Sequence, residues 1–174
     1  MKYLVKIFVV TFLLLIYTNA SAEQKVAYLD MTFVLNNSKA GKGAQDFLQK
    51  SFKENQKIFL DKENSLKKEE SDLLAQKSIL TKEEYEKRSN SLRKKVIDYQ
   101  SQRRTSLEKI TTQRAESRQK LIEKLDPILK TYIEENDISM IIDRKNVLMG
   151  NTNLDITSII VEKLNKEFPS LSIK

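Results

Sequence analysis

The sequence contains neither histidine nor cysteine, and it has only 3 glycines and 2 prolines among its 174 residues. Without imidazole or thiol groups there is no Ser-His-Asp or Cys-His nucleophile system, no zinc or haem ligand set and no disulfide framework. The scarcity of glycine also disfavours a phosphate-binding loop, and neither GxGxxG nor GxxxxGK[ST] occurs. These absences remove most of the usual enzyme classes, and no cofactor is expected.

Carboxylates remain, so a magnesium or calcium site with oxygen ligands stays open as a hypothesis. Asp30, Asp143 and Asp155 lie at or just beyond the ends of predicted strands, where catalytic carboxylates often gather. Nothing in the sequence brings the three together, and helix caps or turns explain each of them singly. We therefore expect a protein that is not an enzyme and holds no metal.

The first 22 residues have the pattern of a secretory signal peptide. Lys2 and Lys6 precede an apolar run over residues 7–17, and the small residues Ala20-Ser21-Ala22 follow it. The run is too short for a membrane-spanning helix, which needs roughly 20 apolar residues, although an uncleaved anchor is the rival interpretation. We expect cleavage after Ala22 and export of the remaining chain.

The rest of the chain divides into a helical middle and two β-type ends. Residues 41–135 are rich in Lys, Glu, Gln, Ser, Leu and Arg, most of them good helix formers, and predict a long helical arm. Residues 23–40 and 136–174 predict a small β-rich body, so the fold class is α+β. Because so few residues make a small domain with unpaired strand edges, we expect several bodies to associate. The sequence itself does not set their number.

Three strands and one helix are predicted within the body. The strand patterns cover Lys25–Asp30, Ile138–Asp143 and Val147–Met149. Asp155 is expected to cap an amphipathic helix, the apolar face of which carries Ile156, Ile159, Ile160, Leu164 and Phe168.

The helical middle predicts an antiparallel coiled-coil hairpin with its tip near residues 78–82. Thr81-Lys82-Glu83-Glu84 has the form of a capping box, which starts a new helix and implies that the previous one has just ended. Apolar side chains recur at intervals of seven on both sides of this point, as an antiparallel coiled coil requires. Folding the chain about residue 79 aligns three pairs: Leu73 with Tyr85, Leu66 with Leu92, and Phe59 with Tyr99.

Net positive charge is concentrated on the second half of this hairpin. Residues 87–120 hold 11 basic and 3 acidic groups, whereas residues 39–76 hold 8 and 7. Such a stripe attracts acidic chains or polyanions over a distance that salt shortens, although a solvated helix face is the simpler interpretation. Nucleic acid is disfavoured, because no aromatic side chains are interleaved for base stacking. The candidate client- or polyanion-binding residues are Lys87, Arg88, Arg93, Lys94, Lys95, Arg103, Arg104, Arg114 and Arg118.

The order of these elements resembles the Skp (OmpH) family of periplasmic chaperones. The segment Lys25–Met31 is similar to the first strand of the family, Asp137–Asp143 to its second strand, and Asp155-Ile156-Thr157 to the start of its final helix. The resemblance implies a homotrimer whose bodies join as a β-barrel, with three hairpins around a central cavity. It also implies a periplasmic holdase that works without ATP and shields unfolded outer-membrane β-barrel proteins during outer-membrane assembly.

Two further interpretations stay open beside this one. Anionic lipid or lipopolysaccharide is a possible additional partner, because some members of the family bind it. The alternative function is a structural coiled-coil scaffold of the cell envelope that binds no client.

Overall fold

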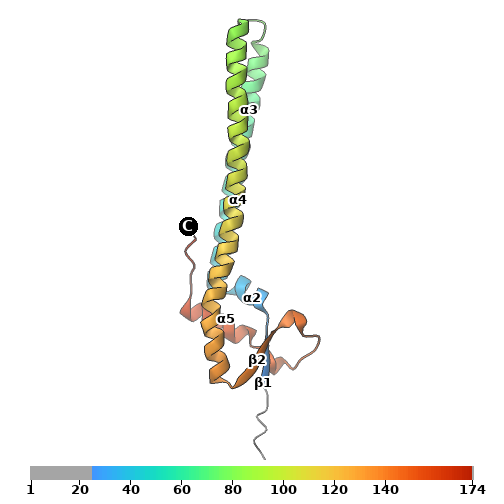
Figure 1. The fold of residues 1–174 in the computed structure, drawn as a ribbon, viewed down its shortest axis with the longest axis vertical. Coiled ribbons are helices and arrows are strands. Elements are labelled where there is room, and N and C mark those ends of the chain that lie inside the picture. Colours follow the sequence, from blue (N-terminus) through green and yellow to red (C-terminus); the bar gives the residue numbers. More distant parts are fainter. Residues whose placement is uncertain (1–24, 174) are drawn as a thin grey trace, which may run out of the picture.

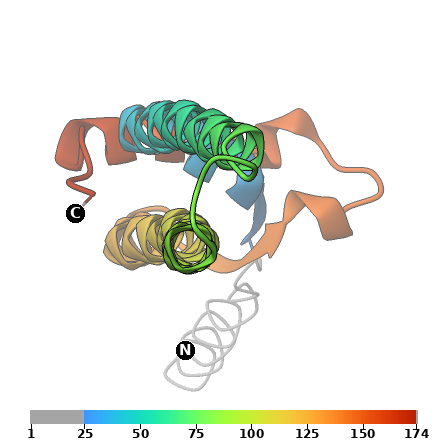
Figure 2. The same ribbon diagram turned by 90° about the horizontal axis from the view of Figure 1, so that it is seen from above.

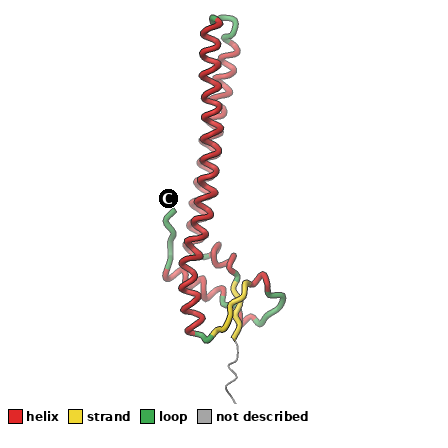
Figure 3. Tube along the Cα trace, viewed as in Figure 1, coloured by secondary structure: helices red, strands yellow, loops and turns green. Residues whose placement is uncertain are grey.

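The computed structural model describes residues 25–173, which form a long helical rod standing on a small body (Figure 1). The predicted signal peptide and its cleavage after Ala22 lie outside the described residues. Helix makes up most of the described chain, and the strands are confined to the body (Figure 3). No described helix combines the length and the apolar character that crossing a membrane requires.

The rod is an antiparallel hairpin of α3 (Lys39–Ala75) and α4 (Lys82–Glu135). At 1.5 Å per residue these helices are about 55 and 80 Å long. The predicted capping box is present at the start of α4: the Thr81 hydroxyl accepts the Glu84 amide at 3.2 Å, and the Glu84 carboxylate accepts the Thr81 amide at 3.4 Å. The predicted hairpin is therefore confirmed, including its point of reversal.

The seam between α3 and α4 is narrow. Phe59 and Tyr99 meet edge to face with their ring centroids 5.9 Å apart, as the predicted pairing requires. Leu73 and Leu92 are also buried, at 9% and 8% exposure. From Ile110 toward the body, the next two buried side chains of α4 are polar rather than apolar.

Those polar side chains are Gln113 and Ser117, of which Ser117 lines a cavity between the two helices together with Ala44 and Leu48 of α3. The Ser117 hydroxyl is satisfied by donating to the backbone oxygen of Gln113 at 2.6 Å. Ser117 and Ala44 are smaller than the apolar side chains that fill an ordinary coiled-coil seam.

The body is built on a parallel pair of strands, β1 (Lys25–Leu29) and β2 (Ile138–Asp143). Their register places Val26 opposite Met140 and Leu29 opposite Asp143. The short helix α2 (Met31–Asn37) follows β1, because the Asp30 carboxylate accepts the Phe33 amide at 2.7 Å and caps it. Both strands lie where the sequence predicts them.

The prediction of a third strand at Val147–Met149 is wrong. The residues after β2 form the 3₁₀ turns η2 (Arg144–Asn146) and η3 (Thr152–Leu154), with an irregular loop between them. Seen from above, this loop projects away from the hairpin (Figure 2). Three apolar residues form a strand only beside a partner strand, and the described chain offers none here. Leu148 and Met149 consequently point into solvent, with exposures of 102% and 93%.

The final helix, α5 (Thr157–Glu167), begins one residue later than predicted. Its N-cap position is Ile156 rather than Asp155, and no side chain caps it. The Asp155 carboxylate nevertheless accepts the Thr157 amide at 3.0 Å, so it still orders the entry to the helix. The predicted apolar face is otherwise present, except that Ile159 is 41% exposed.

One apolar core joins the body to the base of the hairpin. It contains Leu29 of β1, Val34 of α2, Leu125 of α4 and Ile160 and Leu164 of α5, all at most 2% exposed. Because α4 supplies Leu125 directly to this core, the arm is anchored by the same packing that holds the body together.

Candidate functional site

The nine basic residues singled out in the sequence all lie on α4 and are all exposed, but they occupy different sides of the helix. Two of them are tied to α3. Lys95 Nζ lies 2.6 Å from Glu69 Oε1, and Arg88 Nη1 donates to Gln76 Oε1 at 2.7 Å. Their hydrogen-bonding capacity is partly used in holding the hairpin together.

A second group of these residues lies along the opposite edge of the hairpin seam. Arg93, Arg103, Arg114 and Arg118 each line a cavity between α3 and α4. None of the four forms an ion pair with a described carboxylate. Arg93 donates to Asn90 Oδ1 at 3.3 Å on its own helix, and the guanidinium groups of the other three are available to an acidic ligand.

The third group lies away from both edges of the seam. Lys87, Lys94 and Arg104 line none of the cavities found in the described part of the chain. Arg104 lies 3.8 Å from Glu108 one turn further along α4. These three contribute to the general positive field of α4 rather than to a shaped site.

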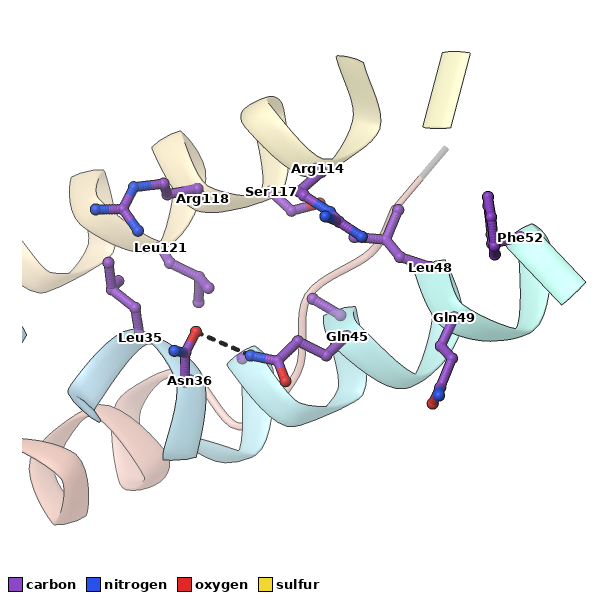
Figure 4. A pocket seen from close by; sticks show the side chains of 12 residues that line it. Leu35, Asn36, Gln45, Leu48, Gln49, Phe52, Arg114, Ser117, Arg118 and Leu121 are labelled. Carbon is purple, nitrogen blue, oxygen red and sulfur yellow. Dashed lines mark hydrogen bonds between the residues drawn. The ribbon is translucent and has the colours of Figure 1, made fainter. Parts of the chain in front are cut away.

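Three cavities on the Arg103 side join into one groove along the hairpin, called here the open groove. The cavity nearest the body has a volume of about 600 Å³ and shares Phe52 with a middle cavity of about 700 Å³. The middle cavity shares Glu63 and Tyr99 with a third, of about 430 Å³, that extends toward the tip. Figure 4 shows the lower end of the groove, with Arg114 and Arg118 on α4 opposite Phe52 and its neighbours on α3.

The open groove also exposes large apolar side chains. Phe52 and Leu60 on α3 are 39% and 56% exposed, and Leu107 on α4 is 42% exposed. These three did not stand out as binding residues in the sequence. Leu60 lies one position after the buried Phe59, so it could have been found as an apolar residue beside the seven-residue repeat.

The other edge of the hairpin, called here the tied flank, is closed by polar bridges between the helices. Lys62 Nζ donates to Gln102 Oε1 at 2.7 Å, and the Glu69–Lys95 and Gln76–Arg88 pairs follow toward the tip. A smaller cavity of about 350 Å³ on this flank is lined by polar and charged side chains apart from the buried Leu73. The two edges of one hairpin thus present different chemistry.

Glu63 is the acidic residue where the middle and upper parts of the open groove meet. Its pKa is lowered, first by the hydrogen bond and charge of Lys67 at 2.7 Å and then by the hydroxyl of Tyr99, with a smaller contribution from Arg103. The same contact raises the pKa of Lys67. Glu63 is therefore ionised and forms its ion pair with Lys67 rather than with Arg103.

The three aspartates considered for catalysis have structural roles. Asp30 caps α2, and Asp155 accepts the Thr157 amide and lies 3.3 Å from Arg144. Asp143 accepts the backbone amide of Lys145, which lowers the pKa of its carboxyl group. Within residues 25–173, no three or more metal-ligating side chains of the His, Cys, Asp or Glu type lie close enough together to hold a metal ion.

Comparison with known proteins identifies the class to which this fold belongs. The family model described as "Outer membrane protein (OmpH-like)" matches residues 25–164, and the chain therefore belongs to the OmpH-like family. A candidate outer membrane chaperone (OmpH-like) from Caulobacter crescentus CB15 has a similar crystal structure, with a TM-score of 0.82. The alignment covers 90% of this chain and 93% of that one at 18% sequence identity, so it supports the shared fold. No curated protein sequence matches the chain.

Proposed function

We propose that this protein is a periplasmic holdase chaperone that binds unfolded outer-membrane β-barrel proteins without ATP and aids their assembly. The observation that carries the proposal is the open groove, where exposed Phe52, Leu60 and Leu107 lie beside arginines that have no carboxylate partner. Membership of the OmpH-like family supports it, since the similar Caulobacter protein is described as a candidate outer membrane chaperone.

The shape of the arm suits a client without a fixed structure. An unfolded outer-membrane protein presents many different apolar segments, which no single deep pocket accommodates. A long surface with apolar and basic contacts binds such segments weakly at several points, and the sum of linked weak contacts gives useful affinity. Release needs no nucleotide, because folding of the client in the membrane removes the segments that the arm binds.

The body provides a surface for self-association, and the proposal includes a homotrimer. Val26 and Met140 on the paired strands are 38% and 55% exposed, and Leu148 and Met149 project fully into solvent. Exposed apolar side chains beside a sheet of two strands are costly in an isolated body and are covered when bodies associate. Three arms arranged around one client multiply the contacts of each arm. The native mass of residues 23–174 should be three times that of the chain, and replacement of Leu148 and Met149 by Asp should lower it.

The test of the chaperone function is the solubility of a client. An unfolded outer-membrane β-barrel protein is diluted from urea into buffer with or without residues 23–174 of this protein, and light scattering is followed. We expect suppressed aggregation at low salt that weakens as ionic strength rises. Aggregation that is unaffected at every salt concentration would favour the alternative, a structural scaffold of the envelope that binds no client.

A further inference from the structure

We propose that each arm binds its client on one flank, along the open groove, as a single extended segment of up to about thirteen residues that carries carboxylates and apolar side chains. This inference rests on the proposed holdase function and specifies the part of the arm that performs it. The tied flank and the outward face of α4 then contribute no direct contact to the client.

The first argument is the difference between the two flanks. On the tied flank, Lys95 and Arg88 of α4 already bond to side chains of α3, and Lys62 of α3 bonds to Gln102 of α4, all at 2.6–2.7 Å. A client that reached this flank would have to displace those bonds before gaining its own. In the open groove, Arg114 and Arg118 have no such partner, so a client carboxylate gains a charge-assisted hydrogen bond without breaking one.

The second argument is the apolar lining. Phe52, Leu60 and Leu107 all line the middle cavity and are 39–56% exposed. Apolar surface in a concave site is removed from water more completely by a ligand than apolar surface on a convex helix face. Ile58 and Ile97 are as exposed, at 50% and 57%, but they line none of the cavities found among the described residues.

The third argument is length. The groove runs from the level of Gly41 to that of Glu70 on α3, which is about 44 Å at 1.5 Å per helical residue. An extended chain rises about 3.3 Å per residue, so the groove accommodates about thirteen residues. A transmembrane β-strand has about 9–11 residues, so the groove is long enough for one whole strand of an unfolded β-barrel.

The spacing of the arginines fits the same occupant. Arg114 and Arg118 are one helical turn apart, about 6 Å along the groove. Side chains on one face of an extended chain repeat about every 6.7 Å. Two carboxylates at alternate positions of the client can therefore meet both arginines, while apolar side chains further along lie on Leu107 and Leu60.

The test compares two triple variants that change the charge of α4 by the same amount. One reverses groove residues (Arg103→Glu, Arg114→Glu, Arg118→Glu) and the other reverses residues outside it (Lys87→Glu, Lys94→Glu, Arg104→Glu). Affinity for a labelled unfolded outer-membrane protein is measured at low salt, with circular dichroism confirming that both variants stay helical. We expect the groove variant to bind about tenfold more weakly and the other variant to bind within about twofold of the parent.

A second pair of variants tests the apolar contacts independently of charge. Leu60→Ser with Leu107→Ser should weaken binding, whereas Ile58→Ser with Ile97→Ser, of similar exposure, should not. A series of synthetic peptides with alternating Leu and Asp adds a measure of length, since affinity should rise to about thirteen residues and then level off.

The outcomes separate this inference from the function on which it rests. Equal losses for the two triple variants would overturn the one-sided groove while leaving the holdase intact. Loss of client binding by the parent protein itself would instead overturn the proposed function. Preferential binding of the groove to vesicles containing anionic lipid, with no competition from the peptides, would assign the groove to a membrane surface and overturn the inference.

Discussion

The body and the arm of this molecule are stabilised in different ways. In the body, Leu29, Val34, Ile160 and Leu164 are at most 2% exposed and contact one another in one cluster. Along the arm the large buried apolar side chains are 4–9% exposed and lie at least eleven residues apart on the same helix: Leu48, Phe59 and Leu73 on α3, and Leu92 and Ile110 on α4. A core residue of the body thus has neighbours on several elements, whereas a seam residue of the arm has neighbours on one facing helix.

This difference in packing implies different mechanical roles for the body and the arm. A dense core unfolds as a unit, because every side chain depends on the others. A chain of separate contacts can loosen at one level while the levels above and below stay paired. We therefore expect a rigid body that anchors a more flexible arm.

The largest expected effect compares one leucine from each region. Leu164→Ala should destabilise the protein by about 2–5 kcal/mol, because it leaves a cavity in a core that cannot collapse around it. The destabilisation caused by Leu92→Ala should lie at or below the low end of that range, because the facing helix α3 can shift toward the smaller side chain. Urea unfolding followed by circular dichroism measures both, and equal losses would contradict the proposed difference in roles.

The next effect concerns two neighbouring glycines at the base of α3. A Cβ at Gly41 would collide with the backbone oxygen of Leu35, whereas a Cβ at Gly43 would meet nothing. Gly41→Ala should therefore cost about 1–3 kcal/mol, because backbone must move to admit it. Gly43→Ala should stabilise the helix by about 0.5–1 kcal/mol. The midpoints of thermal unfolding should move in opposite directions, and a fall in both would show that the arm base tolerates no added methyl group.

A smaller and local effect is expected at the tip. Thr81→Ala removes the hydroxyl that caps α4 and should cost about 1 kcal/mol. Amide exchange should accelerate in the first turns of α4 and leave the body amides unchanged. Ser78→Ala serves as the control, since Ser78 makes no capping bond. Acceleration that spreads into the body would mean that arm and body unfold together.

The smallest effect is the pH dependence of the Glu63–Lys67 contact. The lowered pKa of Glu63 means that its contribution to stability is present above its ordinary value of 4.5 and is lost as pH falls through the lowered folded value. Because the contact is exposed to solvent, the change should be slight. Carboxyl chemical shifts report the Glu63 pKa directly, and Lys67→Met should return it toward 4.5. A pKa that stays low in this variant would assign the shift to Tyr99 and Arg103 instead.

The hairpin could be predicted from the sequence because its determinants are local. The capping box at Thr81 and Glu84 needs only four consecutive residues, and the repeat through Phe59 and Tyr99 follows from helical periodicity. The strand prediction at Val147–Met149 was wrong because a strand needs a neighbouring strand to pair with. Residue types alone do not show whether such a partner is present.

The open groove could not be predicted from the sequence, for a related reason. Arg88 and Arg103 look equivalent as members of one basic stripe, yet one is tied to Gln76 and the other lines a cavity. Which flank of α4 a residue occupies depends on the rotation of α4 against α3. That rotation is set by packing across the whole seam.

The order of residues by itself determined that the middle of this chain is helical, that it reverses near residue 79 and that its second half is basic, because periodicity, capping and charge are properties of short segments. Only the tertiary structure decided that one flank is closed by polar bridges while the other keeps free arginines beside exposed apolar side chains. The physical reason is that a side chain's availability depends on the neighbour it meets across the seam, and that neighbour lies some 25–50 residues away in the sequence.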